Sequence, residues 1–308
     1  MAACLSETLP FFTCDVFTVQ PFAGNPLAIV EDAGALSTAQ MQIIAREFNL
    51  SETIFVLPPR DARHTARVRI FFPTAEIPFA GHPTIGCAIH LALRASQPGD
   101  FETRITLEQE AGLVPVMVSR NNGRVQAELT APIVPHKASA GQIPTTELLA
   151  AMLGLTPGDI GFANHRPGLF EGGPRFLYVP LRDLDALAAA RASEPQWSNA
   201  MKVAAVDSAY LYTRGVECDY QARMFSPTAG IPEDPATGSA SAILAAQLHA
   251  QGLLGDGATR LTLHQGIEMG RPSEITLTVH QKDHVLKAVQ VAGSAVFIAQ
   301  GSIAIPRP

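Results

Sequence analysis

Four residues stand out because their side chains are suited to moving a proton. Three of them lie in two segments that are related to each other, and the fourth lies in a separate segment. His82 stands in IPFAGHPTIG, directly before an apolar stretch, whereas Asp234 and Ser239 stand in EDPATGSASA. Glu52, in NLSETIF, adds a second carboxylate. Carboxylate, imidazole and hydroxyl groups can take up, return or orient protons. Singly, Ser239 is also explained as a helix cap, Asp234 as a turn residue and Glu52 as a solvated carboxylate.

The segments that contain His82 and Ser239 belong to an internal repeat. RIFFPTAEIP (69–78) and RMFSPTAGIP (223–232) are identical at seven of ten positions. After the apolar stretch that follows each of them, ITLEQEAG is echoed by LTLHQGIEMG. Such self-similarity indicates that a unit of strand, loop, helix and strand has been duplicated. Between the matched arms the second copy has a loop that is three residues longer.

Aligning the glycines of the two copies predicts two equivalent helix starts. Pro83 suits the first helical position, so His82 is predicted at one N-cap and Ser239 at the other. The free N–H groups and the positive dipole end of a helix start can bind an anion such as a carboxylate, and glycine lets a ligand approach the backbone. Histidine is a poor N-cap, which favours another duty for His82. The predicted substrate-binding residues are Gly81, His82, Gly238 and Ser239.

Other parts of the sequence predict the elements that must position these residues. Residues 37–49 predict a helix capped by Ser37, with one apolar face lying on a sheet, and residues 84–95 are apolar nearly all round, as in a buried helix. Alternating and β-branched runs predict strands in CDVFTV, PLAIVE, TIFVLP, HTARVRIFF, RITLEQEAG, LVPVMVSR and RVQAELTAP.

A stretch rich in proline, alanine and serine, at residues 130–144, marks the best domain boundary. We predict an N-terminal α+β domain over 1–131, to which the tail 292–308 returns, and a C-terminal α+β domain over 132–291 that duplicates the first.

Composition excludes several classes of partner. The chain has 308 residues, 47% of them apolar, and its 22 Lys and Arg residues form no basic run, so we expect no nucleic-acid partner. The N-terminus lacks a basic region followed by an apolar core, and no apolar run reaches the ~18 residues of a membrane span. We therefore expect a cytoplasmic protein without a membrane partner.

The sequence also lacks the signatures of cofactor sites. The four cysteines lie far apart without CxxC pairs, which is typical of a reducing compartment. Neither HExxH, a P-loop nor a GxGxxG after a strand occurs. We therefore expect no metal, nucleotide or other cofactor. The cysteines are Cys4, Cys14, Cys87 and Cys218.

Several segments, in order and over essentially the whole chain, resemble those of the phenazine-biosynthesis isomerase (PhzF-like) family. They are DVFTVQPFAGNPLAIV, MQIIAREFNLSETIFVLP, RIFFPTAEIPFAGHPTIGCA and RMFSPTAGIPEDPATGSASAILAAQL. The resemblance implies the diaminopimelate-epimerase-like α+β fold. That fold has two pseudo-symmetric domains, each a curved, mostly antiparallel sheet or barrel around a central buried helix, with the active site in the cleft between them.

The same resemblance implies the roles of the site residues. It makes Glu52 the general acid/base and His82 the active-site histidine, with Asp234 and Ser239 as the other catalytic residues. We also expect a homodimer that acts on a small carboxylate-bearing substrate. Related racemases of this fold carry a cysteine at each helix start, where this chain has His82 and Ser239, and Cys87 stands five residues further on.

The leading hypothesis is a cofactor-independent isomerase that moves a proton, and with it a double bond. The alternatives are a racemase or epimerase without catalytic thiols, a hydrolase, for which a GxSxG motif is missing, and a non-catalytic small-molecule-binding protein. Arg175 is either a carboxylate-binding residue or a surface charge at a strand start.

Overall fold

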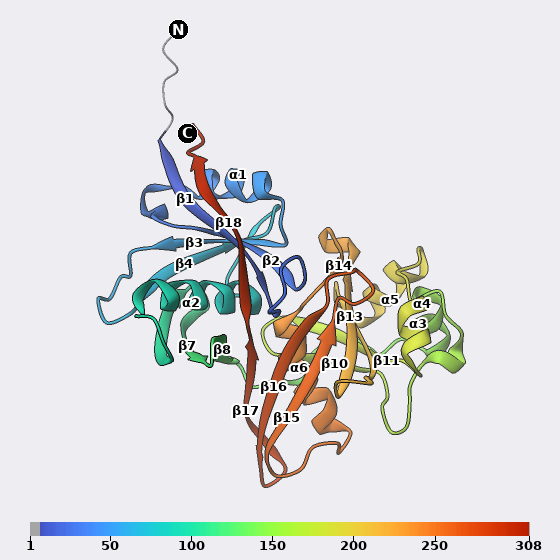
Figure 1. The fold of residues 1–308 in the computed structure, drawn as a ribbon. Helices are drawn as coiled ribbons and strands as arrows, with labels where there is room; N and C mark the ends of the chain where they lie inside the picture. Colours follow the sequence, from blue (N-terminus) through green and yellow to red (C-terminus); the bar gives the residue numbers. More distant parts are fainter. Residues whose placement is uncertain (1–6, 308) are drawn as a thin grey trace. The chain divides into compact units, whose positions relative to one another are not determined.

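The computed structural model describes residues 7–307, which divide into two compact units (Figure 1). Unit 1 runs to Leu129 and resumes at Ala292, whereas unit 2 is Thr130–Val291. The limits expected from the sequence, after residues 131 and 291, lie within two residues of this division. Within the described range, no helix is long and apolar enough to cross a membrane.

The sheet of unit 1 is mostly antiparallel. The last strand of the chain, β18, pairs with the first, β1, and the order continues through β2, β3, β4, β6, β7 and β8. The pairs β2–β3 and β4–β6 are parallel, and β5 pairs with the end of β4. The strands are β1 (Thr8–Val16), β2 (Asn25–Val30), β3 (Glu52–Leu57), β4 (Ala66–Phe71), β5 (Glu76–Ile77), β6 (Phe101–Gln109), β7 (Gly112–Asn121), β8 (Arg124–Thr130) and β18 (Ala295–Ala304).

Helix α1 (Thr38–Phe48) connects the parallel strands β2 and β3 after a short 3-10 turn, η1 (Ala33–Ala35). Its Met41, Ile44 and Ala45 are buried, and it contacts β3 and β4. The Ser37 side chain accepts a hydrogen bond from the Gln40 backbone, and the Gln40 side chain accepts one from the backbone N–H of Ser37. The predicted cap and the predicted apolar face on a sheet are both confirmed.

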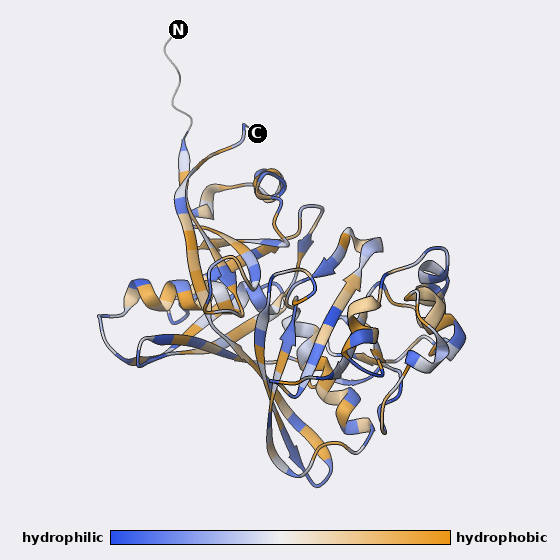
Figure 2. Ribbon diagram, turned by 45° about the vertical axis from the view of Figure 1, so that its right-hand side comes forward, coloured by the Kyte–Doolittle hydropathy of each residue, from blue (hydrophilic) through white to orange (hydrophobic). Residues whose placement is uncertain are grey.

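Helix α2 (Gly81–Ala95) lies at the centre of unit 1, in contact with β1, β2, β3, β6, β7 and β18. Hydrophobic colours dominate it in Figure 2, as expected for a buried helix. A Cβ at Gly86 would lie 2.6 Å from a Leu27 methyl carbon and 2.8 Å from one of Val16. Glycine therefore permits the close packing of this helix on the sheet.

The predicted N-cap position of His82 is wrong. The N-cap of α2 is Ala80, so that His82 and Pro83 lie inside the first helical turn. The first turn of a helix has no internal acceptors for its N–H groups, so proline is tolerated at several of its positions and does not mark the first one.

The strands of unit 2 repeat the pairing of unit 1. Strand β13 is antiparallel to β14 and parallel to β15, as β4 is to β5 and β6. Likewise β11 and β12 are parallel, as β2 and β3 are. The strands after β8 are β9 (His136–Lys137), β10 (Gly168–Glu171), β11 (Arg175–Pro180), β12 (Ala209–Arg214), β13 (Tyr220–Ser226), β14 (Ile231–Asp234), β15 (Gly257–Gln265), β16 (Ser273–Lys282) and β17 (Val285–Gly293).

Each repeated arm is held by an arginine at the same place in the repeat. Arg69 and Arg223 each form a two-pronged pair, with Glu76 at 2.7 and 2.5 Å and with Glu233 at 2.8 and 2.9 Å. Each guanidinium also lies over the ring of a phenylalanine two residues further on. These contacts fix the loop that leads to each central helix.

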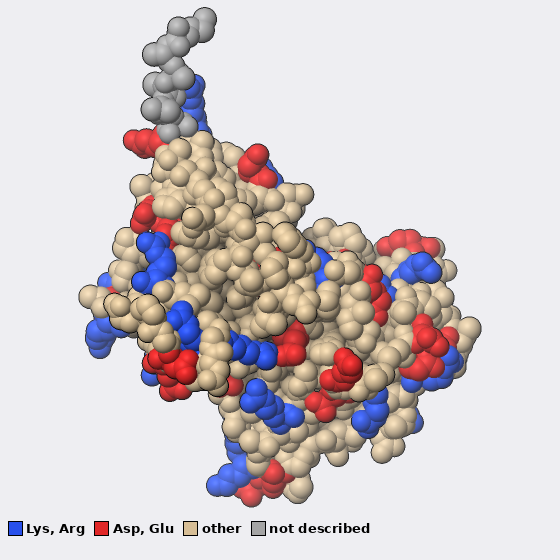
Figure 3. All heavy atoms as spheres, in the orientation of Figure 1, with Lys and Arg blue, Asp and Glu red and all other residues tan. Residues whose placement is uncertain are grey.

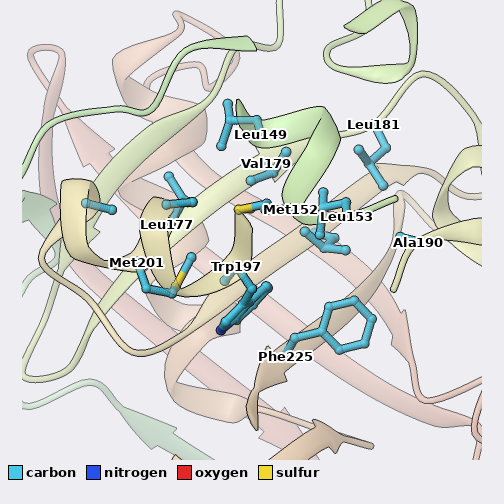
Figure 4. Packing of buried hydrophobic residues seen from close by; sticks show 14 of the residues in the cluster. Leu149, Met152, Leu153, Leu177, Val179, Leu181, Ala190, Trp197, Met201 and Phe225 are labelled. Carbon is cyan, nitrogen blue, oxygen red and sulfur yellow. The ribbon is translucent and has the colours of Figure 1, made fainter. Parts of the chain in front are cut away.

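Unit 2 contains a peripheral helical layer and a central helix. The layer, α3 (Thr146–Met152), α4 (Leu184–Ala189) and α5 (Gln196–Ala204), shares an apolar cluster with strands β11 to β13, in which Trp197 lies beside Phe225 (Figure 4). The 3-10 turns are η2 (Pro157–Asp159) and η3 (Pro227–Ala229). The central helix, α6 (Gly238–Ala250), contacts β9, β10, β11 and β16.

The N-cap of α6 is Thr237, so the predicted cap position of Ser239 is wrong by the same two residues as that of His82. Gly238 and Ser239 are the first two residues of α6, as Gly81 and His82 are of α2. The alignment of the two helix starts is therefore right, although the cap assignment is not.

Candidate active site

The structure brings Glu52 and His82 together in unit 1. Glu52 is the first residue of β3 and His82 the second of α2, and their Oε2 and Nδ1 atoms lie 3.4 Å apart. Their side chains are only 10% and 4% exposed. Two groups that can carry a proton thus meet in a largely desolvated place, beside the N-terminal turn of the central helix.

His82 is held as a neutral imidazole. Burial lowers its pKa to about 3, against the opposite effect of a hydrogen bond to the backbone of Pro26. Proline has no N–H, so the Pro26 carbonyl accepts this bond and the imidazole donates it. Nε2 is buried and finds no hydrogen-bond partner among residues 7–307, so the donor is Nδ1. The Nε2 lone pair is then available to accept a hydrogen bond from a ligand.

The first turn of α2 adds donors to this pair. The backbone N–H groups of Gly81 and His82 lie at the N-terminal end of the helix, where no internal acceptor exists and the helix dipole favours an anion. Glu52 can act as a base and His82 as an acceptor, while these donors hold negative charge. Unit 1 therefore carries the groups required for proton abstraction next to a carboxylate.

Asp234 lies in unit 2, at the end of β14, in a hydrogen-bonded group. Its Oδ2 accepts a bond of 2.5 Å from the Thr237 hydroxyl. Gln265 donates from Nε2 to the Asp234 carbonyl at 2.7 Å and to Thr237 Oγ1 at 3.0 Å. Its Oε1 accepts from the Thr237 N–H at 3.1 Å. All three residues are buried.

Ser239 is half-buried in the first turn of α6, two residues after Thr237. The same turn is fixed by Ser241, whose hydroxyl donates to the Thr237 carbonyl at 2.9 Å and lies 3.2 Å from the Tyr210 hydroxyl. Glu52 and His82 thus form a pair within unit 1, whereas Asp234 and Ser239 flank Thr237 within unit 2.

Arg175 has a structural role. Its guanidinium pairs with Glu171 at 2.7 Å, across the antiparallel pair β10–β11, and contacts the Ser139 hydroxyl at 3.2 Å. Because the carboxylate of Glu171 already pairs with the guanidinium, the surface-charge interpretation is favoured.

The three cysteines among residues 7–307 lie outside the first turns of α2 and α6. Cys14 and Cys87 are fully buried in unit 1, where burial raises the pKa of both thiols, and Cys218 is half-buried in unit 2. Cys4 lies outside the described residues. Residues 7–307 hold no group of three or more His, Cys, Asp and Glu side chains that could bind a metal ion.

Sequence reasoning missed Pro26, Thr237 and Gln265. The carbonyl of Pro26 is a backbone group, which no residue type signals. Thr237 and Gln265 meet 28 residues apart in the chain. The repeat contained one sign of them, since Gln265 in LTLHQ aligns with Gln109 in ITLEQ.

Comparison with known proteins places the sequence in a family. The family model of the phenazine biosynthesis-like proteins (PhzC-PhzF) matches residues 14–301. An uncharacterized isomerase of Mesorhizobium japonicum is 40% identical over 97% of this chain and 100% of its own length. The trans-2,3-dihydro-3-hydroxyanthranilate isomerase of Pseudomonas fluorescens is 36% identical over 94% of this chain and 98% of its own.

Among solved structures, the Bacillus anthracis phenazine biosynthesis protein of the PhzF family superimposes with a TM-score of 0.85 and 27% identity. It covers 97% of this chain and 100% of its own. The predicted α+β class, with the diaminopimelate-epimerase-like fold, is thereby confirmed. Both the family match over nearly the whole length and the named relatives show that this chain belongs to the PhzF-like family of isomerases.

Proposed function

We propose that this chain catalyses a cofactor-independent isomerisation in which Glu52 takes a proton from one carbon of a small carboxylate-bearing metabolite. Glu52 then returns a proton to another carbon, and the double bond moves between them. The observation that carries the proposal is the buried contact of 3.4 Å between Glu52 and His82, at the N-terminal turn of α2.

The groups of unit 1 can support each part of this step. The Glu52 carboxylate accepts the proton, and the electron pair of the broken C–H bond forms a new double bond to the adjacent carbon. The electron pair of the original double bond takes the proton back from Glu52 at the far carbon, so no atom is gained or lost. The N–H groups of Gly81 and His82 stabilise negative charge on the substrate carboxylate. Nε2 of the neutral His82 imidazole accepts a hydrogen bond from a hydroxyl or amino group of the substrate.

Three residues of unit 2 are proposed as further site residues. Gly238 and Ser239 offer the same backbone donors at the start of α6 as their counterparts offer in α2. Asp234 offers a carboxylate that can orient a hydroxyl or an ammonium group. We propose Asp234 and Ser239 as catalytic residues, together with Glu52 and His82.

The named relatives supply the first compound to test. Several are called trans-2,3-dihydro-3-hydroxyanthranilate isomerases, and that substrate carries a carboxylate, an amino group and a hydroxyl group. These are the groups that the proposed donors and acceptors would recognise. A fold family determines the chemistry of a site more strictly than a pathway, so a panel of small amino and hydroxy acids completes the test.

Racemisation through two thiols is not proposed, because both helix starts lack cysteine and Cys87 is enclosed within α2. A racemase that uses Glu52 and His82 remains the alternative outcome and is recognised by chiral analysis of the product. Binding without turnover is the second alternative, and it predicts no exchange of substrate protons with solvent.

The test is turnover in D2O with the wild type, Glu52→Gln and Glu47→Gln. Glu47 is exposed on α1, so its variant controls for loss of a carboxylate. Glutamine keeps the size of glutamate but not its basicity, so Glu52→Gln should lower kcat about 10²- to 10⁴-fold and abolish deuterium uptake into substrate carbon. KM should change little. Turnover of Glu52→Gln near the wild-type rate would contradict the proposal and make His82 the candidate base.

A further inference from the structure

We infer that Thr237 and Gln265 are positioning residues. They orient Asp234 and hold it as a hydrogen-bond-accepting carboxylate, through a series of hydrogen bonds in which each donor and each acceptor is fixed. This inference rests on the proposed function, in which Asp234 is a catalytic residue. Neither residue stood out in the sequence, and both are buried at the junction of β14, α6 and β15.

The orientation of the Gln265 amide is fixed by backbone groups. Its Oε1 faces the Thr237 N–H at 3.1 Å, and its Nε2 faces the Asp234 carbonyl at 2.7 Å. A flipped amide would bring two donors together at Thr237 and two acceptors together at Asp234. Because N–H groups only donate and carbonyl groups only accept, a single orientation satisfies both contacts.

The direction of the next hydrogen bond follows from this orientation. The second hydrogen of Nε2 is donated to Thr237 Oγ1 at 3.0 Å. That hydroxyl therefore accepts from Gln265, and its own hydrogen is directed to Asp234 Oδ2, 2.5 Å away. The carboxylate receives a donor at this oxygen, which fixes its rotation about the Cβ–Cγ bond.

Unit 1 contains a similar pair of hydrogen bonds, which provides an internal control, although its threonine stands elsewhere in the repeat: Thr84 aligns with Ser241 and not with Thr237. Gln109, the counterpart of Gln265, donates to the Thr84 hydroxyl at 2.8 Å. The hydroxyl of Thr84 in turn donates to the Ala80 carbonyl at 2.7 Å. The amide-to-hydroxyl order is therefore shared, but the Thr84 hydroxyl ends on a backbone carbonyl and the Thr237 hydroxyl on a carboxylate.

A second difference concerns the amide oxygen. Gln109 Oε1 is buried and has no hydrogen-bond partner in the part of the chain that the structure describes, whereas Gln265 Oε1 is paired with Thr237 N. The glutamine of unit 2 thus makes three bonds to the loop that carries Asp234. The fuller set of bonds occurs in the copy where the loop ends in a proposed catalytic carboxylate.

The primary variant is Thr237→Val, which keeps the shape of threonine and removes the hydroxyl. It should lower kcat/KM about 10- to 100-fold, as expected for loss of one hydrogen bond to a charged group. Thr237→Ser, which keeps the hydroxyl, should restore kcat/KM to within about threefold of the wild type. Thr84→Val is the matched control, since it makes the same change at a buried hydroxyl that ends on a carbonyl.

A readout that does not need turnover separates this inference from the proposed function. Carbon-13 labelling of aspartate carboxyl groups gives a resonance for Asp234, assigned by its loss in Asp234→Asn. Thr237→Val should move that resonance, Thr237→Ser should leave it near the wild-type position, and Thr84→Val should leave it unchanged. Gln265→Glu, which cannot donate to Thr237, should move it in the same direction as Thr237→Val.

Two results would overturn the inference. One is an Asp234 resonance that stays in place in Thr237→Val. The other is a loss of kcat/KM in Thr84→Val equal to that in Thr237→Val, which would mean that any buried hydroxyl near a helix start has this effect. If instead the wild type turns over no compound of the panel, the proposed function fails. The carbon-13 spectra still decide whether the hydrogen bonds from Gln265 through Thr237 orient Asp234.

Discussion

The central helices α2 and α6 begin alike but are held in place by different forces. Helix α2 packs through apolar side chains and the close approach at Gly86. Helix α6 is also bonded by hydroxyls of the neighbouring strands: Tyr178 donates to the Ala240 carbonyl at 2.7 Å, and the Tyr210 hydroxyl lies 3.2 Å from that of Ser241. A duplicated framework has thus been stabilised in two ways.

The titratable side chains of the two copies differ more than their strand pairing does. Glu52, at the start of β3, pairs in register with Leu27, whereas β12 begins with Ala209, which pairs with Leu177. Of the two units, only unit 1 has a carboxylate at the first residue of this strand. Strand pairing has thus been retained after duplication, while each copy has acquired its own titratable groups.

The largest expected effect is a difference in kcat between variants at His82 and Ser239, which occupy the same position in α2 and α6. His82→Gln should lower kcat about 10²-fold or more, because the imidazole lies against the proposed base. Ser239→Ala should lower kcat at most about tenfold, as expected for one half-exposed hydroxyl bond. Steady-state kinetics of both variants measures the difference. Equal losses would show that the two copies contribute equally to the chemistry.

The next effect is the loss of stability in acid. Burial lowers the pKa of His165 in unit 2 to about 4 and that of His82 in unit 1 to about 3, against 6.5 when unfolded. The unfolded chain therefore binds more protons below about pH 6.5. As the pH is lowered from about 6.5, the free energy of unfolding should fall by up to about 1.4 kcal/mol per pH unit for each histidine, until the pH reaches the pKa of that histidine in the folded protein.

Urea unfolding at a series of pH values measures this slope. His165→Gln should make the slope less steep between about pH 6.5 and 4, because one of the two contributions is removed. Above pH 7 both histidines are neutral in either state, so no histidine-linked change is expected there. An unchanged slope in His165→Gln would show that His165 takes up its proton without unfolding.

A smaller effect tests the close approach of α2. In Gly86→Ala the new Cβ would press on Leu27 and Val16, so the variant should lose about 1 to 3 kcal/mol of unfolding free energy. Gly255→Ala is the matched control, since a Cβ there meets nothing within 4 Å. Denaturant unfolding compares the two. If the variants were equally stable, the sheet would yield at this point and α2 would not depend on glycine.

The smallest effect concerns the tyrosine bonds of α6. Tyr178→Phe removes the hydroxyl that donates to the Ala240 carbonyl and should cost about 1 kcal/mol of unfolding free energy. Hydrogen exchange of the amides in the first turn of α6 should accelerate, while exchange in α2 stays as in the wild type. Unchanged exchange in α6 would mean that apolar packing holds this helix as it holds α2.

Much of the frame could be predicted because its signals are local. The period of Met41, Ile44 and Ala45 reports a single apolar face, and the repeat places two helix starts in register. The cap residues were misplaced because proline is tolerated throughout the first turn. The Thr237–Gln265 contact was missed because it depends on which strand ends lie side by side, and no local period encodes that.

Surface charge illustrates what composition can establish. The face shown in Figure 3 carries Lys and Arg interspersed with Asp and Glu, in keeping with a sequence whose 22 basic and 28 acidic residues form no long run of one sign. Composition describes such an average well. It gives no information about a pair such as Glu52 and His82, whose contact arises only from the fold.

The pairing of β1 with β18 has a consequence for the order in which the protein is made. The ribosome synthesises all of unit 2 after the first strands of unit 1 and before β18, so β1 waits for its antiparallel neighbour until 278 intervening residues have been added. Unit 2, continuous in the chain, can complete its own pairing first. Until then, the backbone donors and acceptors along the free side of β1 form an exposed edge, to which a chaperone or another nascent chain can bind.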